Sequence, residues 1–234
     1  MAKEPVRSEL REAVAIAHFD DGKANALSHD AIRALEAHLD RAETEAGAVL
    51  ISGRPGMLSG GFDLAVMRSG PEEVFRLVTA GAQLFFRFLE FPLPIVIAAT
   101  GHAIAAGAVA LLAADARVGT EGKFKIGLNE VASGMTLPLF AVEMARQRLS
   151  KRHFIRATTQ AELYTPETAV DAGYLDRVTG PENVFDAACA EANRLAALEQ
   201  PAFAMTKQRA HAALVADLRG SLEADLTRLM GLGA

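Results

Sequence analysis

The sequence has almost no cysteine and no concentrated positive charge, and each absence excludes a class of protein. Cys189 is the only cysteine among 234 residues, so the chain can form no internal disulfide, and a reducing, cytoplasmic compartment fits best. The 24 Lys and Arg residues stand against 29 Asp and Glu, which gives a net charge of −5 without any long basic run. A broad nucleic-acid-binding surface is therefore not expected.

Charged residues are also absent from Phe91 to Ala114, a stretch long enough to span a bilayer. Two prolines, Pro92 and Pro94, and the segment Thr100-Gly101-His102 interrupt it, so we interpret it as a buried strand, a turn and a helix of small residues. The first residues carry no apolar segment behind their charge, which predicts no secretory signal. The six histidines show no metal-binding spacing, and we expect no metal, nicotinamide or flavin.

What is present indicates one folded α/β unit, because half of the residues are hydrophobic. A strand pattern over Glu12–Phe19, a helical pattern starting at Ser28 and a second strand over Ala48–Ser52 predict a parallel pair with a crossover. The strand Ile95–Ala99 is again followed by a glycine-bearing turn and a helix. The last third looks helical, and the apolar stripe of the helix Leu218–Met230 is expected to form a subunit contact.

Two glycine-rich turns follow apolar strands and are the first candidates for a ligand site. They are Ser59-Gly60-Gly61-Phe62-Asp63 and the segment from Gly101 to Gly107. Glycine lets backbone N–H groups approach a ligand closely, and two such groups aimed at one point would hold an oxygen that gains negative charge. Spacing alone leaves the alternative open that these are ordinary loops at strand ends.

These turns belong to a pattern that resembles the crotonase (enoyl-CoA hydratase/isomerase) superfamily over nearly the whole chain. Three ordered segments carry the resemblance: Leu58-Ser-Gly-Gly-Phe-Asp-Leu64, Thr100-Gly-His-Ala-Ile-Ala-Ala-Gly-Ala108, and Ile126-Gly-Leu-Asn-Glu-Val131 with Gly134 and Pro138 beyond it. The resemblance implies a spiral of ββα units with a helical C-terminal region. Residues 1–180 would form the spiral core with an acyl-CoA site, and residues 181–234 a helical region for assembly into trimers or hexamers.

The resemblance also implies where an acyl-CoA thioester would bind. The amides of Phe62 and Ala106, with Gly107 beside the second, would form an oxyanion hole for the thioester oxygen. Coenzyme A would enter only as part of the substrate. Its contacts would come from the segment Lys23-Ala-Asn-Ala-Leu27 and the first glycine turn, and the residues expected there are Lys23, Ala24, Ala26, Gly60, Gly61, Asp63 and Leu64. Lys23, Arg54 and Arg68 are the nearby cations that could face its phosphates.

One acidic side chain remains where the resembling hydratases have two. Val109 stands at the first glutamate position of those hydratases, and Glu130 stands at the second. A single glutamate can take a proton from the carbon next to the thioester and return it two carbons further on, which is double-bond isomerisation. This predicts Glu130 as the proton carrier of a Δ3-Δ2 enoyl-CoA isomerase. Two alternatives stay open, a trans-2-enoyl-CoA hydratase and a non-catalytic acyl-CoA-binding protein.

Overall fold

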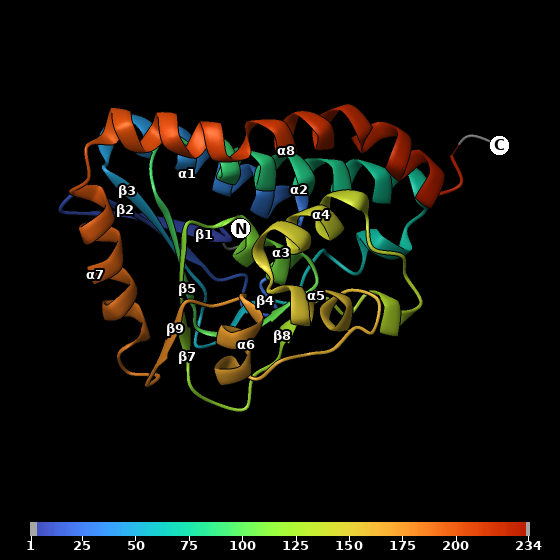
Figure 1. The fold of residues 1–234 in the computed structure, drawn as a ribbon, viewed down its shortest axis with the longest axis horizontal. Coiled ribbons are helices and arrows are strands. Elements are labelled where there is room, and N and C mark those ends of the chain that lie inside the picture. Colours follow the sequence, from blue (N-terminus) through green and yellow to red (C-terminus); the bar gives the residue numbers. More distant parts are fainter. Residues whose placement is uncertain (1–3, 233–234) are drawn as a thin grey trace.

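The larger of two β-sheets forms the centre of the molecule in the computed structural model, which describes residues 4–232 (Figure 1). Its six strands lie in the order β1-β2-β3-β5-β7-β9, and every neighbouring pair is parallel except the β1–β2 hairpin. The strands are β1 (Val6–Arg11), β2 (Val14–Phe19), β3 (Ala48–Ser52), β5 (Ile95–Ala99), β7 (Ala116–Thr120) and β9 (Arg177–Thr179). The predicted parallel pair with its crossover helix is confirmed, whereas β1 was not predicted.

A second, smaller sheet consists of β4 (Gly56–Ser59), β6 (Gly101–Ile104) and β8 (Ile126–Gly127), which lie parallel in that order. The chain thus passes three times through a strand of the large sheet, a strand of the small sheet and a helix. This succession is the spiral of ββα units that the resemblance implied. The sequence predicts a loop and a turn where β4 and β6 lie, because strands this short and this rich in glycine carry no alternating pattern.

The helices begin and end where local sequence signals place them. Ser28 caps the first helix through its Oγ, which accepts a hydrogen bond from Ala31 N (3.2 Å), and Thr165 forms a capping box at α6. The α-helices are α1 (His29–Glu45), α2 (Pro71–Glu90), α3 (Ala106–Ala113), α4 (Leu139–Arg148), α5 (Lys151–Ala157), α6 (Pro166–Ala172), α7 (Val184–Ala196) and α8 (Gln200–Leu229), and the 3₁₀ turns are η1 (Val66–Arg68) and η2 (Val131–Ser133). None of the helices within residues 4–232 is both long and apolar enough to cross a membrane.

The central strands β3 and β5 are buried along their whole length because helices cover both faces of the sheet. Alternate side chains point to opposite faces of a strand. Ile51 and Ile97 accordingly belong to the core that includes α1, α2 and α3, whereas Leu50 and Val96 belong to the core beneath α7 (Figure 1). The short apolar runs of the sequence are therefore doubly covered strands.

Helix α8 is much longer than the predicted helix Leu218–Met230 and runs across α2 and α4 (Figure 1). Leu222 and Leu226 are buried against the rest of the chain, with 6 % and 0 % of their surface exposed. Leu222 and Leu226 therefore do not form the expected subunit contact, because they pack within the chain, whereas Leu229 and Met230 are only half-buried and a contact through them stays a prediction. Assembly through other parts of residues 181–234 stays a prediction.

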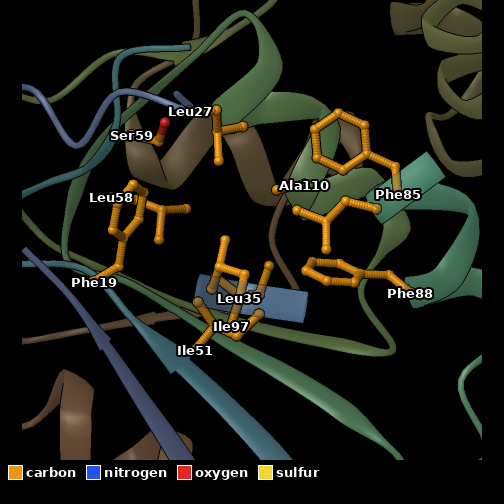
Figure 2. A pocket seen from close by; sticks show the side chains of 11 residues that line it. Phe19, Leu27, Leu35, Ile51, Leu58, Ser59, Phe85, Phe88, Ile97 and Ala110 are labelled. Atoms are coloured by element: carbon orange, nitrogen blue, oxygen red, sulfur yellow. The ribbon is translucent and has the colours of Figure 1, made fainter. Parts of the chain in front are cut away.

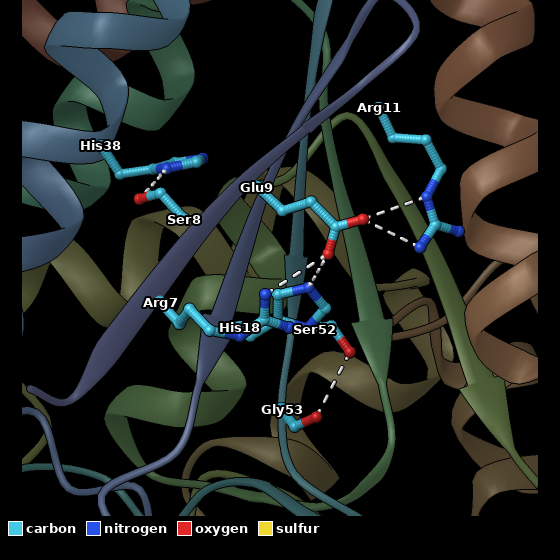
Figure 3. Close-up of polar contacts among 8 residues, drawn as sticks. All are labelled: Arg7, Ser8, Glu9, Arg11, His18, His38, Ser52 and Gly53. Carbon is cyan, nitrogen blue, oxygen red and sulfur yellow. Dashed lines mark hydrogen bonds and ion pairs between the residues drawn. The ribbon is translucent and has the colours of Figure 1, made fainter. Parts of the chain in front are cut away.

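The edge of the large sheet carries a polar cluster on the β1–β2 hairpin, which Figure 3 shows. The Glu9 carboxylate accepts hydrogen bonds from Arg11 Nη2 (2.9 Å) and contacts His18 Nε2 (3.0 Å), and Ser8 Oγ pairs with Nδ1 of His38 on α1 (2.9 Å). Charged side chains on an edge strand oppose pairing with another chain. We therefore assign this cluster to the structure of the hairpin.

Candidate active site

Three strands of the small sheet end at the same edge, and each is followed by one of the three sequence motifs. Because β4, β6 and β8 are parallel, their carboxyl ends point the same way. β4 leads into Gly60-Gly61-Phe62, β6 leads into Ala105 and Ala106 at the start of α3, and β8 leads into Glu130 three residues beyond its end. Segments that are 44 residues (Phe62 to Ala106) and 24 residues (Ala106 to Glu130) apart in the sequence thus emerge side by side. The candidate site lies at this edge.

The two glycine turns touch one another. A Cβ atom added to Gly61, whose φ is +99°, would lie 3.0 Å from Ala105 Cβ and 3.5 Å from Ala106 N. A Cβ atom added to Gly107 would lie 2.5 Å from the carbonyl oxygen of Ser59. Glycine is therefore required at both positions for the turns to approach this closely. The sequence predicted two turns, and the structure brings them into van der Waals contact.

Each turn presents a backbone N–H group without a protein acceptor. Within residues 4–232, neither the N–H of Phe62 nor that of Ala106 donates a hydrogen bond to another protein group. Ala106 is the first residue of α3, where the helix dipole adds partial positive charge. The preceding residue, Ala105, has φ 52° and ψ −123°, a conformation that favours glycine. Free donors beside a strained residue are typical of an anion-binding turn.

The Phe62 side chain holds the first turn against helix α2. Its ring occupies the space above Gly81, because a Cβ atom added to Gly81 would lie 2.3 Å from Phe62 Cε1. Glycine in the middle of a helix lowers stability by about 1 kcal/mol relative to alanine, so its presence here has a steric reason. The role of Gly81 cannot be predicted from the sequence, because only the fold reveals that α2 passes behind the turn.

A third segment, the loop before α1, is fixed to the first turn by Asn25, which sequence reasoning also missed. Asn25 is completely buried at φ 50°, and its Nδ2 donates to the carbonyl oxygen of Phe19 (2.7 Å). Its own carbonyl oxygen accepts a hydrogen bond from Ser59 Oγ (2.7 Å). The Asp21 carboxylate closes the loop by accepting from three backbone N–H groups, including Ala26 N (2.9 Å). These two residues explain why the loop keeps one shape.

The residues predicted to contact coenzyme A border this loop and the first turn. Gly60 N donates to the Ala24 carbonyl oxygen (2.8 Å), so the glycine turn and the loop run alongside each other. Lys23 and Ala24 are exposed, Ala26 is half-buried, and Leu64 is 63 % exposed. This group forms one continuous border next to the free N–H groups.

Two of the polar residues predicted near coenzyme A have local partners. The Asp63 carboxylate accepts a hydrogen bond from Ala65 N (2.7 Å) and so caps its own turn. The Arg54 guanidinium donates through Nε to the Lys23 carbonyl oxygen (2.7 Å). Arg68 lies exposed at the end of η1. The structure therefore gives Asp63 and Arg54 a role in holding the loops, in addition to any role with a ligand.

Glu130 is the acidic group at this edge. Burial raises the pKa of its carboxyl to about 7, and the backbone N–H groups of Glu130 and Asn129 act in the opposite direction. Its Oε2 atom is inaccessible to solvent and has no hydrogen-bond partner within residues 4–232. A carboxyl group with a pKa near 7 can both accept and donate a proton at neutral pH. Glu130 is therefore not an ordinary exposed loop carboxylate.

Helix α3 offers no second acid next to Ala106. Val109 lies one turn along the helix and is 2 % exposed, so it contributes only an apolar surface. His102 is also occupied locally, because its Nδ1 accepts a hydrogen bond from Lys125 N (3.0 Å). No group of three potential metal ligands occurs in the part of the chain that the structure describes. The groups identified at this edge without a protein partner are therefore the N–H groups of Phe62 and Ala106 and the Oε2 atom of Glu130.

A small cavity of about 30 Å³ lies below the first turn, between the large sheet and helices α1 to α3 (Figure 2). Its lining is apolar apart from Ser59, whose Oγ is engaged with Asn25. The lining residues are Phe19, Leu27, Leu35, Ile51, Leu58, Ser59, Leu84, Phe85, Phe88, Ile97 and Ala110. A cavity of this kind offers no group for catalysis, so we assign it to packing.

Comparison with known proteins identifies the family and the fold of the chain. The family model described as enoyl-CoA hydratase/isomerase matches residues 9–232. A crystal structure of an enoyl-CoA hydratase/isomerase family protein from Pseudomonas syringae is 41% identical, with TM-score 0.95 over 98% of this chain and 100% of that chain. An enoyl-CoA hydratase structure from Mycobacterium ulcerans is 38% identical, with TM-score 0.90 over 94% of this chain and 99% of the other. The human mitochondrial enoyl-CoA delta isomerase 1 is 27% identical over 94% of this chain and 75% of its own length.

Proposed function

This chain belongs to the enoyl-CoA hydratase/isomerase family and is an enzyme of that family, and from this premise we propose that it isomerises 3-enoyl-CoA to 2-enoyl-CoA. The observation that carries the proposal is the single carboxyl group of Glu130, whose pKa of about 7 suits proton transfer in both directions. Val109 supplies no second acid. Isomerisation needs one proton carrier, whereas water addition benefits from two.

The proposed reaction begins when the thioester oxygen accepts hydrogen bonds from the N–H groups of Phe62 and Ala106. The ionised Glu130 carboxylate removes a proton from C2, and the electron pair of the broken C–H bond forms an enolate that these two donors stabilise. The protonated Glu130 then returns the proton to C4, while the double bond moves from C3–C4 to C2–C3. No atom is gained or lost. Removing one oxyanion-hole donor typically costs about 2.7–4 kcal/mol of transition-state stabilisation.

Binding of the coenzyme A portion would use the border formed by the loop before α1 and the first turn. Lys23, Ala24 and Ala26 lie on the loop side, and Gly60, Gly61, Asp63 and Leu64 lie on the turn side. Lys23 and Arg68 are exposed cations on this border that could face phosphate groups. A cytoplasmic location and assembly as a homotrimer or hexamer complete the proposal.

The decisive experiment compares the purified protein on 3-enoyl-CoA and trans-2-enoyl-CoA substrates of several chain lengths. We expect the ultraviolet absorbance of a conjugated thioester to rise with the first substrate and no rapid hydration of the second. Glu130→Gln should lower kcat by about 10²–10⁴-fold or more with little change in acyl-CoA affinity, because it removes the proton carrier and keeps the volume. Glu121→Gln, at an exposed position after β7, is the matched control.

Each of the other outcomes would support a different function or a different proton carrier. Rapid hydration of the 2-enoyl substrate would favour the hydratase, the function named for the Mycobacterium ulcerans relative. Binding of both substrates without turnover would favour the non-catalytic acyl-CoA-binding protein. Full activity of the Glu130→Gln variant would show that another group carries the proton.

A further inference from the structure

One position on the buried face of α2 has no side chain of its own. Gly81 lies four residues after Leu77 and four before Phe85, and both of these side chains are completely buried. This spacing places Gly81 on the same stripe of the helix, where a large apolar side chain is expected. Gly81 has no positive φ, and alanine is the stronger helix former, so the backbone does not require glycine there. The cause lies outside the helix.

The ring of Phe62 fills the space that a side chain at Gly81 would occupy. A Cβ atom added there would lie 2.3 Å from Cε1, 2.5 Å from Cζ and 3.7 Å from Cδ1 of that ring. The first two separations are far shorter than van der Waals contact, which begins at 3.4 Å, whereas the third is an ordinary contact. Only the outer edge of the ring thus rests against the backbone of the helix.

The backbone of Phe62 is held on two further sides. Leu27 forms a parallel bridge with Phe62, in which Leu27 N donates to the Gly61 carbonyl oxygen (2.9 Å) and Asp63 N donates to the Leu27 carbonyl oxygen (3.3 Å). In such a bridge, the residue between the two bonds directs its own N–H to the opposite side. Gly61 in turn lies against Ala105. The free N–H of Phe62 is therefore placed by the loop before α1, by the second turn and, through its ring, by α2.

Helix α2 is the stiffer of the two partners in this contact. It packs against α1, α3 and α8, whereas the Phe62 side chain is only half-buried and Leu64 beyond it is 63 % exposed. A methyl group added to α2 therefore displaces the turn, because a close-packed interior transmits strain. The edge of the ring would have to retreat from 2.3 Å to 3.4 Å, and a misplacement of about 1 Å near the reacting atoms can cost about 10²-fold in rate.

We propose that Gly81 is a positioning residue for the oxyanion hole: because it lacks a side chain, the Phe62 ring rests directly on α2, and this contact sets the place of the Phe62 N–H. The inference rests on the proposed function, in which that N–H stabilises the enolate. A donor acts on the oxyanion only when it lies about 2.7–3.1 Å from it. The depth at which the ring meets the helix therefore decides whether the donor is in range.

The kinetic test is Gly81→Ala, which adds one methyl group at this contact. We expect kcat per folded molecule on 3-enoyl-CoA to fall by about 10–10²-fold with KM nearly unchanged, because the displaced donor stabilises the enolate less while the border for coenzyme A stays as it is. Gly220→Ala is the matched control, since Gly220 lies inside α8 and an added Cβ would meet no atom within 4 Å. Its kcat should not change. A kcat that falls no further in Gly81→Ala than in this control would overturn the inference.

A second substitution separates the positioning role from a general effect on the helix. Phe62→Leu keeps the main-chain N–H and an atom equivalent to Cδ1, but it removes Cε1 and Cζ, the two atoms that an alanine at position 81 would meet. In the Phe62→Leu background, Gly81→Ala should therefore leave kcat unchanged or raise it. This comparison remains possible if the single Gly81→Ala variant does not fold. A fall in kcat of similar size in both backgrounds would show that alanine acts on the helix itself, against the inference.

A further measurement needs no turnover. The probe is a saturated acyl-CoA labelled with ¹³C at the thioester carbonyl, whose resonance moves downfield when the oxygen accepts hydrogen bonds. We expect a clear downfield shift on binding to the unsubstituted protein and to Gly220→Ala, and a smaller shift on binding to Gly81→Ala. Equal shifts in all three proteins would contradict the inference even if the enzyme proved to be an isomerase. A smaller shift in Gly81→Ala, in a protein that hydrates 2-enoyl-CoA and does not isomerise 3-enoyl-CoA, would support the positioning role and sink only the proposed reaction.

Discussion

The two ends of helix α3 are built in opposite ways, although only eight residues separate them. At the N-terminal end, Ala105 is strained and the N–H of Ala106 has no acceptor in the described chain. At the C-terminal end, Arg148 donates through Nε to the Leu112 carbonyl oxygen (3.3 Å) and through Nη2 to that of Ala114 (2.5 Å). One end leaves its backbone groups free, and the other satisfies them with a charged side chain.

Buried charge pairs reinforce this second end. Asp115, just after α3, accepts hydrogen bonds from Ile95 N (2.8 Å) and from Lys207 Nζ (2.5 Å). Burial lowers the pKa of Lys207 and, together with the neighbouring Arg117, lowers the pKa of Arg148 to about 10. These cations are held in place by carboxylates and carbonyl oxygens. The ionisable groups at this end serve stability.

The contrast has a chemical reason. An oxyanion can be stabilised only by donors that are not already occupied, so the N-terminal end must leave its N–H groups free. A cation beside Glu130 would hold its carboxyl ionised and prevent it from carrying a proton. Within residues 4–232, Glu130 accordingly forms no ion pair, and its Oε2 lacks a partner. The cations gather at the opposite end of the same helix.

The largest expected effect on this contrast between the two ends comes from Lys207→Met, which leaves Asp115 buried without its cation. Removing one partner of a buried pair typically costs about 3–5 kcal/mol, and the exposed fractions of the two side chains are 4 % and 17 %. We expect a loss of that size in the free energy of unfolding, measured by urea denaturation, with kcat per folded molecule unchanged. Lys123→Met, at an exposed position, is the control. A loss as small as that of the control would show that the pair is not structural.

The second prediction concerns the stability that the folded protein loses by burying the Glu130 carboxyl. Burial raises the pKa of Glu130 from 4.5 to about 7 in the folded protein. The stability that the folded protein gains by keeping this carboxyl protonated is therefore fully present below pH 4.5 and is lost as pH rises through 7. Glu130→Gln removes this loss. Relative to the unsubstituted protein, the variant should therefore be more stable at pH 8 than at pH 5 by about 2.5 kcal/mol. Parallel urea denaturations at the two pH values measure this difference. An equal effect at both pH values would place the carboxyl in solvent.

The sequence predicted the three motifs of the site but not the surface that joins them. Gly60-Gly61, the segment ending at Gly107 and Glu130 are recognisable because each departs from its local pattern through glycine or through a lone acid. Their meeting depends on three parallel strands of two to four residues, which have no periodic signal of their own. Helix starts at Ser28 and Thr165 were predictable because capping is local.

The supporting residues could not be found in this way because their roles arise from contacts distant in the sequence. Asn25 bonds to the strand that begins at Gly56, and Gly81 accommodates a ring from the first turn. The misassigned stripe at Leu222 has the same origin, because an apolar helix face indicates burial without saying whether its partner is the same chain or another.

The smallest expected effect comes from Ala105→Gly at the free end of α3. Ala105 has φ 52° and ψ −123°, a region that costs a residue with a Cβ atom about 1–3 kcal/mol. Glycine removes this strain but adds about 0.4–1 kcal/mol of unfolded-state entropy, so we expect a net gain of about 1 kcal/mol in the free energy of unfolding. Ala108→Gly, a buried position with ordinary helical neighbours in α3, should instead lose about 1 kcal/mol. If both variants lose stability equally in urea denaturation, the strain at the start of α3 is not real, and the two ends of the helix differ only in their hydrogen bonds.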